Sequence, residues 1–234
     1  MIAPDLIGMG DSGKPDMPYR FGDQVRYFDA FIEALGLEDV TFVLHDWGGG
    51  VGFDHAMRNQ ENMRGLVFFE AAVRPQTWSE LPQPVRSLFK LLRSSKGDRL
   101  MLDENYFIEK LLPVMVGRKL SEAEHDAYRA PFKDKAARKP VRVFPQQFPI
   151  DGLPAGNHAR MTSTYQAITT TNVPLLLLTA TPGAGTSAET FISEIPNLQA
   201  TDVGEGLHYV QETQPTAIGE AVSAFIDALP SRSA

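Results

Sequence analysis

The chain has 234 residues, a length typical of one α/β domain with a single hydrophobic core. Its formal net charge of −7 argues against nucleic acid or an anionic membrane as a partner. It contains no cysteine, which excludes disulfides, thiolate catalysis and cysteine-ligated metals. The longest apolar stretch is only strand-sized and the N-terminus lacks the pattern of a signal peptide, so we expect a cytoplasmic protein.

The first part of the chain predicts a helix, a strand and a second helix. Apolar residues three and four apart indicate a helix from about Val25 to Leu35, which ends near Gly36. The run Val40–His45 is typical of a buried strand, and it is followed by a glycine cluster and a helix to about Arg58.

Three further apolar runs predict strands, namely Gly65–Glu70, Val173–Ala180 and Leu198–Val203. After them, apolar residues at helical spacing indicate a C-terminal helix from about Ile218 to Leu229. Continuous apolar strands favour a mostly parallel sheet covered by helices on both faces, hence an α/β fold.

Residues 75–159 differ from the flanking regions because they carry helical apolar patterns and prolines but no strand series. Helices inserted between two strands of a parallel sheet are typical of a cap over an active site. We therefore expect a core formed by residues 1–74 and 160–234, with residues 75–159 as its helical cap.

The strongest chemical signal is the segment His45-Asp46-Trp47-Gly48-Gly49-Gly50. It lies where a buried strand must turn sharply into a helix, and its small residues permit a strained turn that exposes the Asp46 side chain. A carboxylate can attack a saturated carbon and form an ester, which divides one difficult displacement into two easier steps. Taken alone, the position is equally consistent with Asp46 as the N-cap of the helix.

His208 lies between the last predicted strand and the last helix, where enzymes with a nucleophile elbow carry their general base. It would activate the water that hydrolyses the ester, and an ordinary surface histidine is the alternative. His45 is expected to point to the opposite side of its strand and to be structural.

Glu70 ends the second strand and would hold the His208 imidazole in one tautomer. The end of the third strand offers no carboxylate, which favours Glu70, and an ion pair between Glu70 and Arg74 is the alternative. Trp47 follows the nucleophile, and its indole N–H would suit an anionic leaving group. The alternative for Trp47 is simple packing.

Segments across nearly the whole chain resemble the haloalkane dehalogenases, which have the α/β-hydrolase fold. The matching segments are Asp5–Gly13, His45–Gly49, Phe69–Ala71, Leu120–Glu124, Tyr128–Phe132 and Gly206–Glu212. The shared cap segments make the match more specific than the elbow alone, which also occurs in epoxide hydrolases and fluoroacetate dehalogenases. Glu70 resembles the acid of the subgroup with an Asp-His-Glu triad.

The resemblance implies a reaction without cofactor or metal. Asp46 would displace halide from a small haloalkane, Trp47 would hold the halide ion, and His208 with Glu70 would drive hydrolysis to an alcohol, halide and a proton. It also implies an apolar pocket, with lining positions at Leu81, Phe89, Phe107, Phe148 and Leu207. Epoxide hydrolysis, coelenterazine luciferase chemistry and a catalytically weakened, truncated homologue are the alternatives.

One departure from the family concerns its halide site. The family has a second hydrogen-bond donor to the halide, commonly the asparagine of a His-Gly-Asn turn after the third strand. This sequence contains no His-Gly-Asn and begins at what resembles the fourth family strand. Trp78 is a weaker candidate for that donor. Without the family's N-terminal strands, one edge of Val40–His45 is expected to be exposed, and an exposed edge favours a homo-oligomer.

Overall fold

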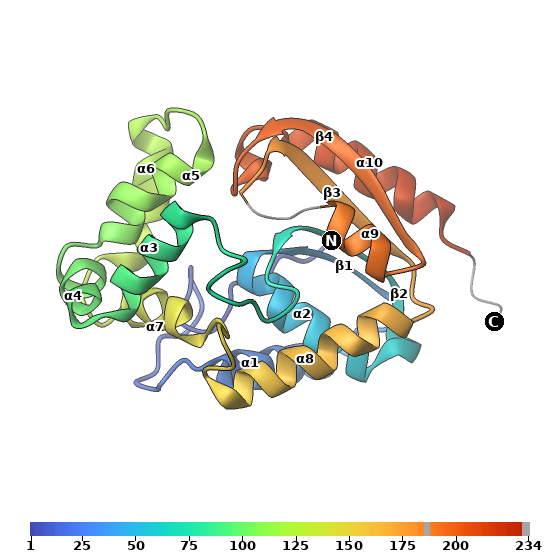
Figure 1. The fold of residues 1–234 in the computed structure, drawn as a ribbon, viewed down its shortest axis with the longest axis horizontal. Coiled ribbons are helices and arrows are strands. Elements are labelled where there is room, and N and C mark those ends of the chain that lie inside the picture. The colour runs from blue at the N-terminus through green and yellow to red at the C-terminus, as the bar shows by residue number, and fades with distance from the viewer. Residues whose placement is uncertain (185–187, 231–234) are drawn as a thin grey trace. The chain divides into compact units, whose positions relative to one another are not determined.

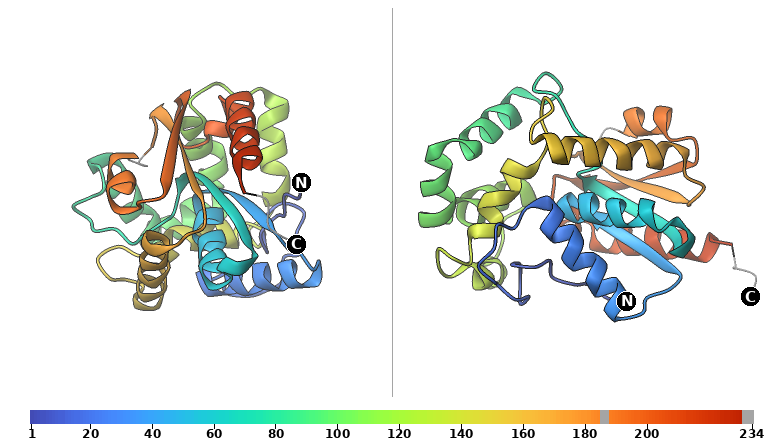
Figure 2. Two further views of the ribbon diagram at one scale, coloured as in Figure 1. Left: turned by 90° about the vertical axis from the view of Figure 1, so that its right-hand side faces the viewer. Right: turned by 90° about the horizontal axis from the view of Figure 1, so that it is seen from below.

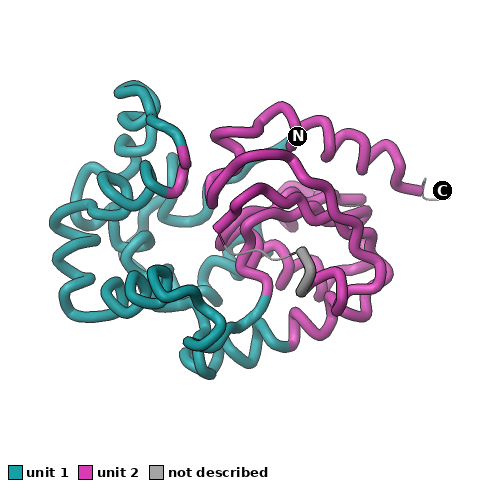
Figure 3. Tube along the Cα trace, turned by 45° about the horizontal axis from the view of Figure 1, so that its top comes forward, with its two compact units in different colours: residues 1–31, 74–114, 118–162 teal, residues 32–73, 115–117, 163–234 magenta. Residues whose placement is uncertain are grey.

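The computed structural model describes residues 1–184 and 188–230 (Figure 1). By their contacts, the residues divide into two compact units, which Figure 3 colours separately. Unit 1 comprises residues 1–31, 74–114 and 118–162, and unit 2 comprises residues 32–73, 115–117 and 163–234.

The parallel sheet lies in unit 2 and has four strands in the described residues. These strands are β1 (Val40–His45), β2 (Met63–Ala71), β3 (Leu175–Pro182) and β4 (Leu198–Gly206). Their order in the sheet is β1-β2-β3-β4, and each neighbouring pair is parallel. The predicted parallel α/β sheet is thus confirmed.

Helices lie on both faces of the sheet (Figure 2), and alternating side chains of β2 pack against them. Val67 and Phe69 belong to a buried cluster that includes Phe225 of α10 (Pro215–Ala228). On the other face, the Phe68 ring lies 5.1 Å from that of Phe53 in α2 (Asp46–Arg58) and 6.0 Å from that of Phe191 in α9 (Ala188–Glu194). Both faces of β2 are therefore buried, as its continuous apolar sequence predicts.

Unit 1 consists of helices and loops. Its helices are α3 (Gln83–Arg93), α4 (Ser95–Asp98), η2 (Arg99–Asp103), η3 (Phe107–Leu111), α6 (Glu122–Arg129), η4 (Ala130–Phe132) and α7 (Lys139–Gln147). Buried Arg142 ties three of these helices together, because its Nε lies 2.7 Å from Asp98 Oδ1 and its Nη1 donates to the Leu92 carbonyl at 2.9 Å. The proposed cap, residues 75–159, contains none of the four strands.

Three helices contribute residues to both units, namely α1 (Phe21–Ala34), α5 (Leu112–Val116) and α8 (Ala155–Thr170). The two short helices of unit 2 are η1 (Gln60–Asn62) and η5 (Val210–Glu212). In the described ranges, no helix combines the length and the apolar character needed to cross a bilayer.

Strand β1 lies at one end of the sheet order, and the outward-facing Val43 is 48% exposed. The exposed edge expected for Val40–His45 thus corresponds to an end strand of the described sheet. Association of a second copy along this edge stays a prediction.

Candidate active site

Strand β1 turns into helix α2 at Asp46, where the backbone φ is +44°. A non-glycine residue rarely adopts this left-handed conformation, and such strain is common where a fold must present a reactive side chain. The Asp46 side chain is 45% exposed. The N-cap of α2 is His45, which makes no side-chain capping hydrogen bond, so the interpretation of Asp46 as the N-cap is wrong.

Glycines let α2 pack closely behind the turn. A Cβ added at Gly49 would lie 2.6 Å from the Ala71 Cβ, and one added at Gly52 would lie 2.3 Å from a Leu44 methyl carbon. Both distances are too short for any larger residue without a shift of the neighbours. The glycine cluster therefore sets the distance between the helix that carries Asp46 and the strands behind it.

Glu70 lies near the end of β2, also with a positive φ, of +42°, and its side chain is only 7% exposed. Its Oε1 accepts a hydrogen bond from the Ala184 backbone N–H at 3.1 Å. Gly183 permits this approach, because its φ is +66° and a Cβ there would lie 3.1 Å from the same oxygen. Arg74 instead pairs with Glu80 at 2.9 Å, so the alternative of a Glu70–Arg74 ion pair is not observed.

The His208 imidazole lies between the two carboxylates. Its Nε2 is 3.6 Å from Asp46 Oδ1, and its Nδ1 is 3.6 Å from Glu70 Oε2. Burial disfavours the protonated ring, but the Glu70 carboxylate and the charge of Asp46 outweigh it and raise the pKa of His208. The structure therefore brings together the three residues that the sequence singled out as nucleophile, acid and base.

His45 contacts the backbone of the proposed base. Its Nε2 is 2.8 Å from the His208 carbonyl oxygen, and the two imidazole centroids are 4.7 Å apart. Leu44 packs toward Gly52 of α2, whereas the His45 ring stacks on Phe69, which belongs to the cluster on the other face of the sheet. The predicted orientation of His45, on the opposite side of its strand, agrees with these contacts, and on that side its ring reaches the backbone of His208.

Trp47 lies in the first turn of α2 and is 9% exposed. Its role as a hydrogen-bond donor to the halide stays a prediction. Trp78, the weaker candidate for a second donor, lies in unit 1, where the Lys90 ammonium is 5.4 Å and the Arg93 guanidinium 5.5 Å from its ring centroid. The Trp78 ring thus lies near two cations. These contacts do not test its proposed role as a hydrogen-bond donor to the halide.

The five predicted pocket positions are divided between the two units. Leu81, Phe89, Phe107 and Phe148 lie in unit 1, and Leu207 lies in unit 2. Leu81 is buried and the other four are half-buried. The rings of Phe89 and Phe148 are 5.9 Å apart, so these two form one aromatic pair. That these residues line a substrate pocket stays a prediction.

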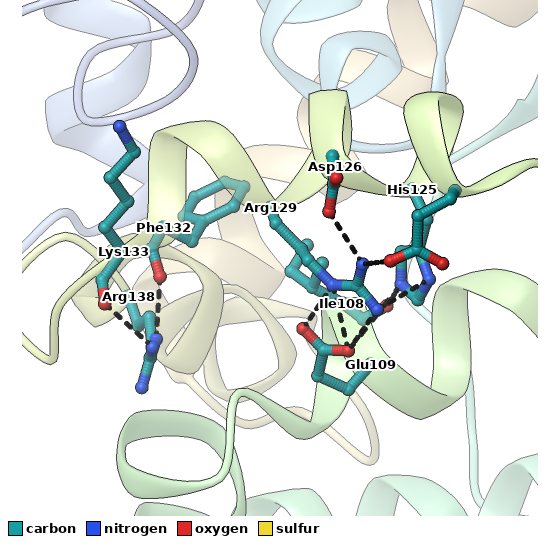
Figure 4. Close-up of polar contacts among 9 residues, drawn as sticks. Ile108, Glu109, His125, Asp126, Arg129, Phe132, Lys133 and Arg138 are labelled. Atoms are coloured by element: carbon teal, nitrogen blue, oxygen red, sulfur yellow. Dashed lines mark hydrogen bonds and ion pairs between the residues drawn. The ribbon is translucent and has the colours of Figure 1, made fainter.

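A second polar cluster lies in unit 1 around Arg129 of α6 (Figure 4). The Arg129 guanidinium donates to Glu109 at 2.9 Å, to Asp126 at 2.8 Å and to Glu122 at 3.2 Å. It also donates to His125 Nδ1 at 3.0 Å, while His125 Nε2 donates to the Ile108 carbonyl at 2.8 Å. This cluster, which the sequence did not reveal, holds α6 against η3.

Comparison with known proteins gives one consistent result. A family model described as "alpha/beta hydrolase fold" matches residues 1–100. A haloalkane dehalogenase from Mesorhizobium japonicum is 42% identical over 232 residues, which cover 96% of this chain and 75% of that protein. A haloalkane dehalogenase from Sphingobium indicum is 41% identical, with 97% of this chain and 79% of that protein covered.

Solved structures agree with the sequence comparison. The crystal structure of the haloalkane dehalogenase DbeA from Bradyrhizobium elkani superposes with a TM-score of 0.93 at 39% sequence identity. The match covers 96% of this chain and 79% of that structure. The α/β-hydrolase fold predicted from the sequence is therefore confirmed.

Proposed function

We propose, from the premise that this chain belongs to the haloalkane dehalogenase family, that Asp46, His208 and Glu70 carry out its hydrolysis of carbon–halogen bonds. One observation carries the assignment of roles: a single imidazole lies 3.6 Å from a carboxylate on each side. One of these carboxylates is exposed at a strained turn, and the other is buried.

In the first step, the Asp46 carboxylate attacks the carbon that carries the halogen. A carbon–oxygen bond forms, the carbon–halogen bond breaks, and the halide leaves with the bonding electron pair. Asp46 suits this role because its side chain is exposed while its backbone is held at the start of α2. The neighbouring Trp47 would donate its indole N–H to the departing halide.

In the second step, water hydrolyses the ester at Asp46. Nδ1 of His208 faces Glu70, so the neutral ring carries its proton on Nδ1 and Nε2 is the free base that takes a proton from water. The hydroxide attacks the ester carbonyl carbon, and the alcohol and the free Asp46 carboxylate result. Glu70 stabilises the imidazolium ion, in agreement with the raised pKa of His208.

The proposed substrate is a small, apolar haloalkane. Phe89, Phe107, Phe148, Leu81 and Leu207 would line its pocket, as the family resemblance implies. Apolar surroundings favour the first step because a poorly hydrated carboxylate is a stronger nucleophile than a fully hydrated one. No charged group is needed to recognise such a substrate, and the products are an alcohol, a halide ion and a proton.

Halide release from 1,2-dibromoethane by the purified chain tests the proposal. We expect release in the unsubstituted protein and a loss of at least about 10⁴-fold in Asp46→Ala, because this substitution removes the proposed nucleophile. Circular dichroism of both proteins controls for folding. Equal release by a folded Asp46→Ala variant, or turnover of epoxides and coelenterazine without halide release, would contradict the assignment.

A further inference from the structure

The residue before the nucleophile makes a direct contact with the backbone of the proposed base. His45 Nε2 lies 2.8 Å from the His208 carbonyl oxygen, across 163 positions of sequence. A carbonyl oxygen can only accept a hydrogen bond, so the His45 Nε2–H is the donor and its tautomer is fixed. We propose that His45 is a positioning residue that holds the His208 loop in place against the nucleophile turn.

The sheet itself does not supply this connection. Asp46 follows β1 and His208 follows β4, and the sheet order places β2 and β3 between them. Backbone hydrogen bonds of the sheet therefore link the two catalytic segments only through two other strands. The hydrogen bond from His45 links the segments directly, one residue from the nucleophile and at the base residue itself.

The His45 ring also packs beside the third catalytic group. It stacks on Phe69, the residue before Glu70, with ring centroids 5.0 Å apart. The Tyr209 ring, 5.5 Å away, contacts it from the side of the base loop. His45 thus precedes Asp46 in the chain and packs against the neighbour of Glu70, and from this fixed place its hydrogen bond holds the His208 loop.

The charge state of His45 fits this role. Burial, and after it the neighbouring His208 imidazole, lowers the pKa of His45, although Asp46 and Glu70 act in the opposite direction. A neutral His45 leaves His208 free to accept a proton without a second cation 4.7 Å away. The hydrogen bond and the ring contacts carry the inference, and the neutral charge agrees with them.

This inference rests on the proposed function and predicts a specific kinetic difference. Ester formation needs Asp46 and a hydrogen-bond donor to the departing halide, whereas ester hydrolysis also needs His208 at the correct angle and distance. A displaced His208 loop should therefore slow hydrolysis much more than ester formation, and the ester should accumulate. A residue that only stabilises the fold would lower both rates through the fraction of folded enzyme.

The test compares three substitutions in the complete chain, with 1,2-dibromoethane as the substrate. His45→Phe keeps a ring but removes the donor, His45→Asn is too short to reach the carbonyl, and His45→Gln keeps an N–H at a comparable reach. Rapid-quench kinetics and intact mass give the rates of ester formation and hydrolysis separately. Val43→Ala, at an exposed position of the same strand, is the matched control.

We expect His45→Phe and His45→Asn to slow hydrolysis about 10² fold while ester formation changes by less than about threefold, because small displacements of a catalytic group have large effects. His45→Gln should recover most of the hydrolysis rate, and Val43→Ala should change neither rate. Equal loss of both rates, unchanged hydrolysis in folded His45→Phe, or hydrolysis in His45→Gln as slow as in His45→Phe would overturn the inference. Absence of halide release by the unsubstituted chain would instead count against the proposed function itself.

Discussion

Two clusters in this molecule combine carboxylates with a histidine, and they differ in the balance of charge. In unit 2, the His208 imidazole lies between the carboxylates of Asp46 and Glu70. In unit 1, the Arg129 guanidinium lies among three carboxylates and the His125 ring. The first cluster gains a positive charge only when His208 takes up a proton, whereas the second carries a permanent one.

The permanent charge has visible effects on its neighbours. The hydrogen bonds from Arg129 lower the pKa of Glu109, and the bonds to Glu109 and Asp126 raise the pKa of Arg129. His125 must be unprotonated at Nδ1 to accept from Arg129. The cluster around Arg129 thus holds its cation at all times, as a structural contact should. The His208 cluster gains its cation only when a proton arrives, as a catalytic base requires.

Replacing His208 should break the first cluster with the largest effect. In His208→Ala, Asp46 can still attack the haloalkane, but no base activates the water, so turnover should fall at least about 10³-fold. Incubation with 1-bromohexane should leave a protein heavier by one hexyl group. An unmodified intact mass, or normal turnover, would contradict the role of His208 as the base.

Replacing Glu70 should have the next largest effect. Glu70→Gln removes a charge that holds the imidazolium, and we expect turnover to fall about 10² to 10⁴-fold, as for other triad acids. Because Glu70 raises the pKa of His208, its loss lowers that pKa. The neutral imidazole is the base, so the rise of the hydrolysis rate with pH should move to lower pH.

The pH profile of ester hydrolysis in single-turnover experiments measures this shift. Glu80→Gln is a suitable control, because Glu80 is an acid of unit 1 that pairs with Arg74. A profile in Glu70→Gln that is unchanged, or that moves to higher pH, would show that Glu70 does not act on His208 as proposed.

Replacing Arg129 should have the smallest effect on catalysis and a modest one on stability. Arg129→Met leaves Glu109, Asp126 and Glu122 without their shared cation, so we expect Tm to fall by about 1 to 3 °C, more at low salt. Halide release at 25 °C should change by less than about twofold. Lys135→Met, which removes an exposed ion pair to Asp103, should lower Tm less, and differential scanning calorimetry compares the two.

The strands were predictable because their apolar runs are continuous. The run Val40–His45 coincides with β1. Strand β2 begins two residues earlier and ends one residue later than predicted, and β3 begins and ends two residues later than predicted. Strand β4 continues to Gly206, beyond the predicted end at Val203, because its pairing with β3 depends on backbone groups and its side chains are largely exposed. Hydrophobic patterns cannot reveal such an extension.

The site was predictable to the extent that strand ends carry it. Asp46, Glu70 and His208 each follow or end a strand, and strands that are parallel bring such positions together. The contacts of His45 and Ala184 were not predictable, because they depend on where the His208 loop lies and on a backbone N–H. The Arg129 cluster depends on how α6 packs against η3, which no local pattern encodes.

The positive φ angles of Asp46 and Glu70 set thermal stability against activity. A side chain in this conformation costs about 1 to 3 kcal/mol, and glycine adopts it without a steric penalty. Directed evolution for heat resistance alone would therefore favour glycine at both positions and would remove the nucleophile and the acid together. Engineers who stabilise this scaffold should hold these two positions fixed and look for improvements elsewhere.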